Sequence, residues 1–151
     1  MPSDQRIIQH VDAIVGRPDD EGITLALVVV HRGEVIAERY GTPGGRRVLV
    51  IGVIHGNEAA GTAIVQELRA GGAPEGVELW LVESMNPDGQ TIDDRQNANQ
   101  VDLNRNSPYK WGPIGVPGDG QYAGTGPASE PETQAMVNFI AQLRPDIATW
   151  Y

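Results

Sequence analysis

A histidine and a glutamate lie three positions apart in the segment His55-Gly56-Asn57-Glu58. Imidazole nitrogens and carboxylate oxygens are good zinc ligands, and two protein ligands leave coordination positions open for water and substrate. A metal ion polarises a carbonyl and acidifies its bound water, so the pattern favours metal-assisted hydrolysis. The spacing alone has a simpler explanation, because a glutamate at a helix N-terminus also interacts favourably with the helix dipole.

The elements around this pair are predicted by apolar patterning. Val48–Ile54 is a continuous apolar run that leads directly into the histidine, and such runs are typical of strands covered on both faces of a parallel sheet. Ala59–Arg69 has helical spacing and is followed by Gly71-Gly72, and Val77–Val82 is a second strand. Together they predict a right-handed βαβ unit. Ligands bind beyond the carboxyl ends of parallel strands, where the histidine and the glutamate fall.

The N-terminal part of the chain predicts a helix and a hairpin. Residues 4–16 place apolar side chains at helical spacing. Ile23–His31 and Glu34–Tyr40 are rich in strand-forming residues and are separated by Arg32-Gly33, so they predict a β-hairpin.

The C-terminal part combines a long irregular segment with two further elements. Residues 85–128 show no periodicity and predict a long loop, which in a compact domain is usually functional. Ser129-Glu130-Pro131-Glu132 has the pattern of a capping box with a first-turn proline, so a helix is predicted from there to about Leu143, and both glutamates are expected only to cap it. Asp146–Tyr151 predicts another strand.

Length and composition predict a single domain over residues 1–151, and the order of the predicted strands and helices makes it an α/β domain. With 20 acidic and 11 basic residues the formal net charge is −9, which disfavours nucleic acid and anionic membranes as partners. There is no cysteine and therefore no thiolate ligand or thiol nucleophile. Polar residues 4–6 stand where a signal peptide needs an apolar stretch, and no run approaches a membrane span, so we expect a cytoplasmic protein.

Four segments, in this order and spacing, resemble the zinc carboxypeptidases of the carboxypeptidase A type, which include bacterial murein-peptide amidases. They are His55-Gly56-Asn57-Glu58, Asn86-Pro87-Asp88-Gly89, the pattern R-x-N-A-N-x-V-D-L-N-R-N over residues 95–106, and Ser129-Glu130-Pro131-Glu132-Thr133. The resemblance covers about residues 46–151, with residues 1–41 as an addition. It implies a carboxypeptidase-like α/β fold with a mainly parallel sheet and crossover helices, Zn²⁺ as cofactor, and a peptide-like or other small-molecule substrate.

The resemblance also implies roles for particular residues. His55 and Glu58 match the first two zinc ligands, and Arg95 matches the arginine that stabilises the oxyanion of the tetrahedral intermediate. Asn104 and Arg105 match the pair that binds the terminal carboxylate of the substrate. Guanidinium groups suit both tasks, because they bind carboxylates bidentately and stabilise developing negative charge. The general base is unassigned.

Two family features are missing. The family has a third zinc-binding histidine just past the strand that follows the S-E-P-E-T helix, and a general-base glutamate much further on, whereas this sequence stops at Tyr151. The other histidines, His10 and His31, are possible additional ligands from the same or a neighbouring subunit, although structural or solvated roles are commoner for such residues. A sheet cut at this point leaves open strand edges, so we expect a truncated fold that forms a homodimer or a higher homo-oligomer.

Other patterns keep two alternatives open. Residues 22–41 resemble the opening hairpin of serine β-lactamases and penicillin-recognising esterases, so a fusion of two genes is one interpretation. Ser107-Pro108-Tyr109-Lys110 fits the S-x-x-K pattern of those enzymes, but it continues the D-L-N-R-N segment. The leading hypothesis is a zinc-dependent hydrolase of an amide, ester or phosphoester. The alternatives are a non-catalytic fragment that oligomerises and a serine hydrolase that uses Ser107 and Lys110.

Overall fold

The computed structural model of the chain describes residues 28–30 and 34–151. The elements follow in the order β1 (Val28–Val30), β2 (Glu34–Gly41), β3 (Arg46–Ile51), α2 (Ala60–Gly71), β4 (Val77–Val82), α3 (Pro87–Ile92), α4 (Leu103–Asn106), α5 (Pro131–Leu143) and β5 (Ile147–Trp150).

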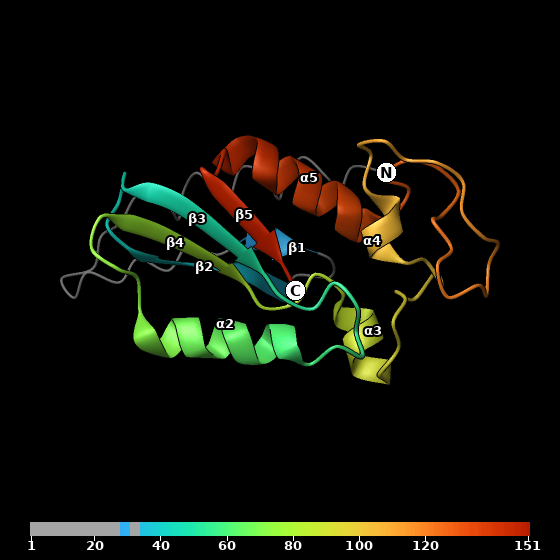
Figure 1. Cartoon of the computed structure of the whole chain (residues 1–151), viewed down its shortest axis with the longest axis horizontal. Coiled ribbons are helices and arrows are strands. Elements are labelled where there is room, and N and C mark those ends of the chain that lie inside the picture. The colour runs from blue at the N-terminus through green and yellow to red at the C-terminus, as the bar shows by residue number, and fades with distance from the viewer. Residues whose placement is uncertain (1–27, 31–33) are drawn as a thin grey trace.

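The strands form one mixed sheet in the order β1-β2-β4-β3-β5. β3 is parallel to both neighbours, with Leu49 opposite Trp80 of β4 and Ala148 of β5, while β2 is antiparallel to β4. Helices α2 and α5 lie on opposite faces of the sheet (Figure 1). This arrangement confirms the predicted α/β class and the β3–α2–β4 unit.

Two apolar layers hold the helices to the sheet, because successive side chains of a strand point to opposite faces. On the α5 face, Leu49 and Trp80 pack with Phe139, and the two aromatic rings meet edge to face at 5.8 Å between centroids. On the α2 face, Val50 and Leu81 pack with Val65. The strands between these layers are thus covered on both sides, as their continuous apolar runs predicted.

The predicted strand Val48–Ile54 is wrong at its C-terminal end, because β3 stops at Ile51. Val53 is fully buried and has φ of 47°, a left-handed conformation that turns the chain out of the strand. Such a conformation costs about 1–3 kcal/mol and persists only where the surroundings impose it. The turn directs the segment that begins at His55 across the edge of the sheet.

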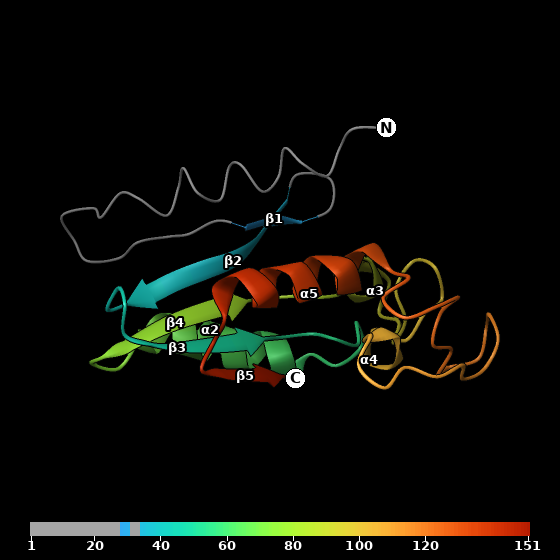
Figure 2. The ribbon, with the colours of Figure 1, turned by 90° about the horizontal axis from the view of Figure 1, so that it is seen from above.

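The irregular segment 85–128 contains two short helices that the lack of periodicity did not reveal. Asn86 caps α3 by accepting a hydrogen bond from Gly89 N, and Asp102 caps α4 by accepting one from Asn104 N. Figure 2 shows α3 and α4 beyond one end of the sheet, together with the long connection to α5. Capping polar side chains, rather than an apolar stripe, start these helices.

Helix α5 begins at the predicted place but not with the predicted cap. Glu130 is its N-cap residue and makes no side-chain capping bond. The carboxylates of Glu130 and Glu132 are instead buried and accept hydrogen bonds from Asn97. The expectation that these glutamates only cap the helix is therefore wrong, because both are turned inward to a polar partner.

The described part of the predicted hairpin is confirmed, since β1 and β2 pair antiparallel. The predicted helix 4–16, residues 23–27 of the hairpin, and the histidines His10 and His31 lie outside the described residues. In the part of the chain that the structure describes, no helix is both long and apolar enough to span a bilayer.

Helix α2 approaches the turn after β3 so closely that Gly61 has no room for a side chain. A Cβ atom there would lie 2.5 Å from Val53 N. We predict that Gly61→Ala lowers the free energy of unfolding by about 1–3 kcal/mol, measured by urea denaturation, although alanine is the better helix former. Gly71, in the same helix, has open space around its Cβ position and is the matched control. Equal stabilities of Gly61→Ala and Gly71→Ala would contradict this packing.

Candidate functional site

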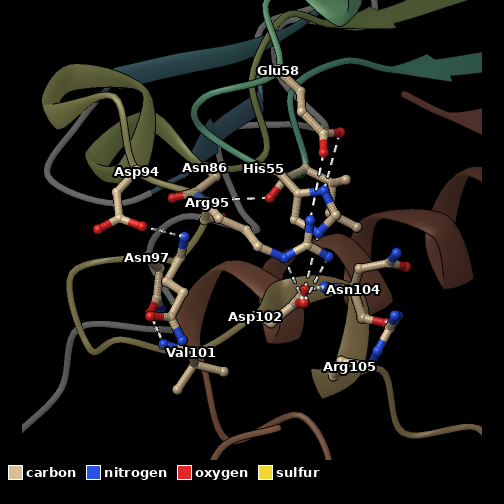
Figure 3. Close-up of polar contacts among 12 residues, drawn as sticks. His55, Glu58, Asn86, Asp94, Arg95, Asn97, Val101, Asp102, Asn104 and Arg105 are labelled. Atoms are coloured by element: carbon tan, nitrogen blue, oxygen red, sulfur yellow. Dashed lines mark hydrogen bonds and ion pairs between the residues drawn. The ribbon is translucent and has the colours of Figure 1, made fainter. Parts of the chain in front are cut away.

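The candidate site lies beyond the carboxyl ends of β3 and β4. His55 and Glu58 belong to the turn between β3 and α2, and Asn86 follows β4. Arg95 and Asp102 come from the connection between α3 and α4, so three separate segments meet at this edge (Figure 3).

His55 is buried, and its two ring nitrogens face different carboxylates. Nε2 lies 3.0 Å from Asp102 Oδ1, and Nδ1 lies 3.1 Å from Glu58 Oε2. Nδ1 nevertheless makes no hydrogen bond within the described part of the chain. An ionised Asp102 accepts at Nε2 and so favours the tautomer of the imidazole that has its lone pair on Nδ1. A buried imidazole nitrogen with a lone pair, next to a carboxylate, can provide two ligands for a cation.

Asp102 joins the residues of the site to one another. Its fully buried carboxylate accepts hydrogen bonds from His55 Nε2 and Asn104 N at Oδ1, and from Arg95 Nε and Nη2 at Oδ2, at 2.9–3.0 Å. The contact with Arg95 is bidentate, which fixes the plane of the guanidinium. Arg95 Nη1 lies 3.5 Å from Glu58 Oε1, so the arginine also faces the second predicted ligand.

Asn86 ties the turn after β3 to the segment that contains Arg95. Its side chain is fully buried, and Nδ2 lies 3.4 Å from the carbonyl oxygen of Ile54 and 3.3 Å from that of Arg95. Its Oδ1 accepts from Gly89 N at 2.9 Å. One side chain thus satisfies backbone groups of three segments next to the site.

Glu130 anchors the far side of the same connection. Its carboxylate accepts hydrogen bonds from the side chains of Asn97, Asn99 and Ser129 at 2.7–2.9 Å. Burial alone would raise the pKa of Glu130, but these three donors outweigh burial and hold the pKa of the carboxyl below its ordinary value. Glu130 is therefore an anion at neutral pH.

The two residues predicted to bind a substrate carboxylate lie on α4. The side chain of Asn104 is exposed, while Arg105 is half-buried and donates from Nη1 to the carbonyl oxygen of Asn104 at 3.3 Å. Between residues 34 and 151 no carboxylate forms an ion pair with Arg105. In Figure 3 both side chains lie on the same side of Asp102.

Ser107 and Lys110 do not form a nucleophile pair. Ser107 follows the last residue of α4, whereas an S-x-x-K serine begins a helix. Lys110 Nζ lies 5.3 Å from the centroid of the Tyr109 ring, and no hydrogen bond within the described ranges joins the lysine to the serine. The geometry gives no support to the serine-hydrolase alternative.

His55 and Glu58 are the two predicted metal ligands that lie among the described residues. No group of three or more histidine, aspartate or glutamate side chains in that part of the chain is arranged to hold a metal ion. His55 Nδ1 and Glu58 fit two positions of a zinc site by chemistry and by the unpartnered lone pair.

Sequence patterns identified the candidate ligands but missed the residues that orient them. Asp102, Asn86 and Asn97 lie within the quoted motifs, yet the sequence gives no periodicity that identifies their partners. Asp102 caps α4, and it also binds His55 and Arg95.

Comparison with known proteins agrees with this geometry. The family model described as zinc carboxypeptidase matches residues 73–149. Murein peptide amidase A of Escherichia coli K12 is 32% identical over 108 residues, which are 64% of this chain and 45% of the amidase. Carboxypeptidase SOL1 of Arabidopsis thaliana is 31% identical over 106 residues, which are 62% of this chain and 20% of that protein.

Solved structures show the same fold. The murein-tripeptide amidase MpaA of Escherichia coli O157 superposes with a TM-score of 0.60 at 23% identity, covering 91% of this chain and 63% of that one. Thrombin activatable fibrinolysis inhibitor superposes with a TM-score of 0.69 at 18% identity, covering 97% of this chain and 45% of that one.

The fold defines the class of protein as an α/β sheet with a histidine and a glutamate beyond the carboxyl ends of its parallel strands. Within that class, the chain belongs to the zinc carboxypeptidase family. It spans less than half the length of the two curated relatives named above.

Proposed function

We propose that this chain supplies part of the centre of a zinc-dependent hydrolase that cleaves peptide-like amides next to a carboxylate. His55 Nδ1 and Glu58 hold the metal. The observation that supports this most directly is the buried Nδ1 without a hydrogen-bond partner, 3.1 Å from a carboxylate oxygen and opposite an Nε2 that Asp102 already binds. Membership of the zinc carboxypeptidase family supports the same metal and reaction type.

Each side chain then has a distinct task. Bound zinc would polarise the scissile carbonyl and acidify water. Asp102 keeps the imidazole proton on Nε2, and it holds the Arg95 guanidinium so that it faces the region beside Glu58, where negative charge develops. Asn104 and Arg105 bind the carboxylate of the substrate, which suits a guanidinium without an acidic partner between residues 34 and 151.

Completion of the site requires ligands beyond these two. His10 and His31, from this chain or from a neighbouring subunit, are the candidates within the sequence. A site with few protein ligands is open to solvent, so activated esters and phosphoesters are suitable assay substrates beside peptides.

Zinc content tests this proposal. We predict that metal-free protein takes up about one zinc per chain, and that His55→Ala weakens zinc binding by more than tenfold, since it removes the proposed imidazole ligand. Isothermal titration calorimetry measures both. Gln134→Ala, an exposed change on α5, is the control and leaves binding unchanged.

Two results would contradict the proposal. Wild-type protein without zinc uptake would favour the non-catalytic alternative. Hydrolysis that survives chelator and His55→Ala but is lost in Ser107→Ala would favour the serine hydrolase.

We further propose that the chain associates through β5. This strand is last in the sheet order and, among the described strands, pairs only with β3; Ile147 and Trp150 on it are 46% and 44% exposed. An unpaired strand edge with apolar side chains is a template for pairing with another chain, here a second copy.

A charge on this edge tests the dimer. We predict that sedimentation velocity shows a dimer for the wild-type chain and a monomer for Ile147→Lys, because a lysine on an edge strand opposes pairing. Val116→Lys changes a valine that is 61% exposed in the connection before α5, and it leaves the dimer intact. A monomeric wild-type chain would refute the proposal.

A further inference from the structure

The segment between Arg95 and Asp102 is closed around one buried side chain, that of Asn97. The backbone N–H of Asn97 donates to Val101 O at 3.0 Å, and its Oδ1 accepts from Val101 N and Asn99 N, each at 3.0 Å. Figure 3 shows the side chain of Asn97 facing Val101. These bonds hold residues 97–101 in one compact loop.

The other end of the same amide faces two carboxylates. Asn97 Nδ2 donates to Glu130 Oε2 at 2.9 Å and to Glu132 Oε2 at 3.2 Å, and all three side chains are buried. An ionised carboxylate can only accept, so the two glutamates determine that the NH₂ group points to α5 and the oxygen to the loop. The lowered pKa of Glu130 agrees with an anion at this place.

This loop determines how two residues of the candidate site face each other. Arg95 lies two positions before Asn97, and Asp102 directly follows Val101, which Asn97 binds. The bidentate pair of Arg95 and Asp102 therefore joins the two ends of the loop that the hydrogen bonds of Asn97 close. The backbone N–H of Asp102 donates to Tyr122 O, which holds the same end of the loop from outside.

We propose that Asn97, oriented by Glu130 and Glu132, is a positioning residue that places Asp102 against His55 and Arg95. It touches neither the proposed metal nor the substrate and acts through the carboxylate of Asp102. The metal part of the test rests on the proposed function, whereas the contact between Arg95 and Asp102 does not.

Three variants separate this role from simple loss of stability. Asn97→Asp keeps the acceptor that faces the loop but sets a carboxylate against Glu130 and Glu132, so the loop should shift. Glu130→Gln keeps one acceptor oxygen and should have a smaller effect. The double variant Asn97→Asp/Glu130→Gln lets the new glutamine donate to the new aspartate, which restores one hydrogen bond with reversed direction.

The control is Glu78→Gln at the start of β4, at the opposite end of the sheet. Glu78 is buried and accepts from Arg39, Arg47 and Gly44 N, so its replacement lowers stability without touching the site. Thermal unfolding of each metal-free protein gives the stability against which the other measurements are compared.

Two measurements report positioning. Competition with a chromophoric chelator gives the zinc dissociation constant, and NMR of ¹⁵N-labelled metal-free protein follows the Arg95 Nε–H resonance, assigned with Arg95→Lys. We expect Asn97→Asp to weaken zinc binding about tenfold, the lower end for residues that orient a ligand, and to shift or broaden the Arg95 resonance. The double variant should recover part of both changes, and Glu78→Gln should show neither.

Either of two results would overturn the proposal. One is an Arg95 resonance that is unchanged in Asn97→Asp. The other is a Glu78→Gln variant that has the same melting temperature as Asn97→Asp and shows the same change in the Arg95 resonance. If Asn97→Asp does not fold, the proposal requires that Glu130→Gln weakens zinc binding and shifts the Arg95 resonance, each by a smaller amount. An unchanged Arg95 resonance in Glu130→Gln would then count against the proposal. If the wild-type chain binds no zinc but Asn97→Asp still shifts the Arg95 resonance, the proposed function is refuted and the positioning role is supported.

Discussion

The arrangement of the candidate site depends on one buried carboxylate, that of Asp102. A fully buried charge is stable only when donors surround it, and here an imidazole, a guanidinium and a backbone N–H converge on its two oxygens. Because each donor comes from a different part of the site, the carboxylate fixes their mutual positions. Without this carboxylate, His55, the proposed ligand, and Arg95, the proposed oxyanion residue, would share no hydrogen-bond partner that fixes their relative positions.

The fold brings these donors together through turns and not through regular elements. Val53, in a left-handed conformation, ends β3 early and sends His55 across the sheet edge. Asn86 then joins that turn to the backbone of Arg95. Both features occupy the carboxyl end of the parallel strands, where loops are held by a rigid sheet and can keep precise geometry.

The sequence predicted the regular elements well and the irregular ones poorly, for a physical reason. β4 has the predicted bounds, and α2 differs from its prediction by one or two residues at each end, because apolar periodicity determines both. The end of β3 was misplaced, since Gly52 and Val53 continue the apolar run while the backbone already turns. The spacing of apolar residues does not predict a positive φ such as that of Val53, because neighbouring segments impose this angle.

Polar side chains account for the remaining differences at the site. The motifs named His55, Glu58 and Arg95, and the structure brings these three residues together. They did not show that Glu130 and Glu132 face inward, because the same residue types at a helix start usually cap it. A buried asparagine between two glutamates is recognisable only when segments about 30 residues apart are seen side by side.

Membership of the zinc carboxypeptidase family and this geometry agree on the part of the centre that lies in residues 34–151. That part holds the two proposed ligands, and the described residues do not form a complete metal site. In this pair, His55 Nε2 is bound by Asp102, and Nδ1 faces the carboxylate of Glu58.

The most direct test of this account is therefore the tautomer of His55. A ¹⁵N NMR spectrum of the metal-free protein, with the resonance assigned by His55→Ala, distinguishes a proton on Nε2 from one on Nδ1. The account predicts that Nε2 carries a proton, and that the Nδ1 resonance changes when zinc is added. A proton on Nδ1 together with an unprotonated Nε2 would contradict it.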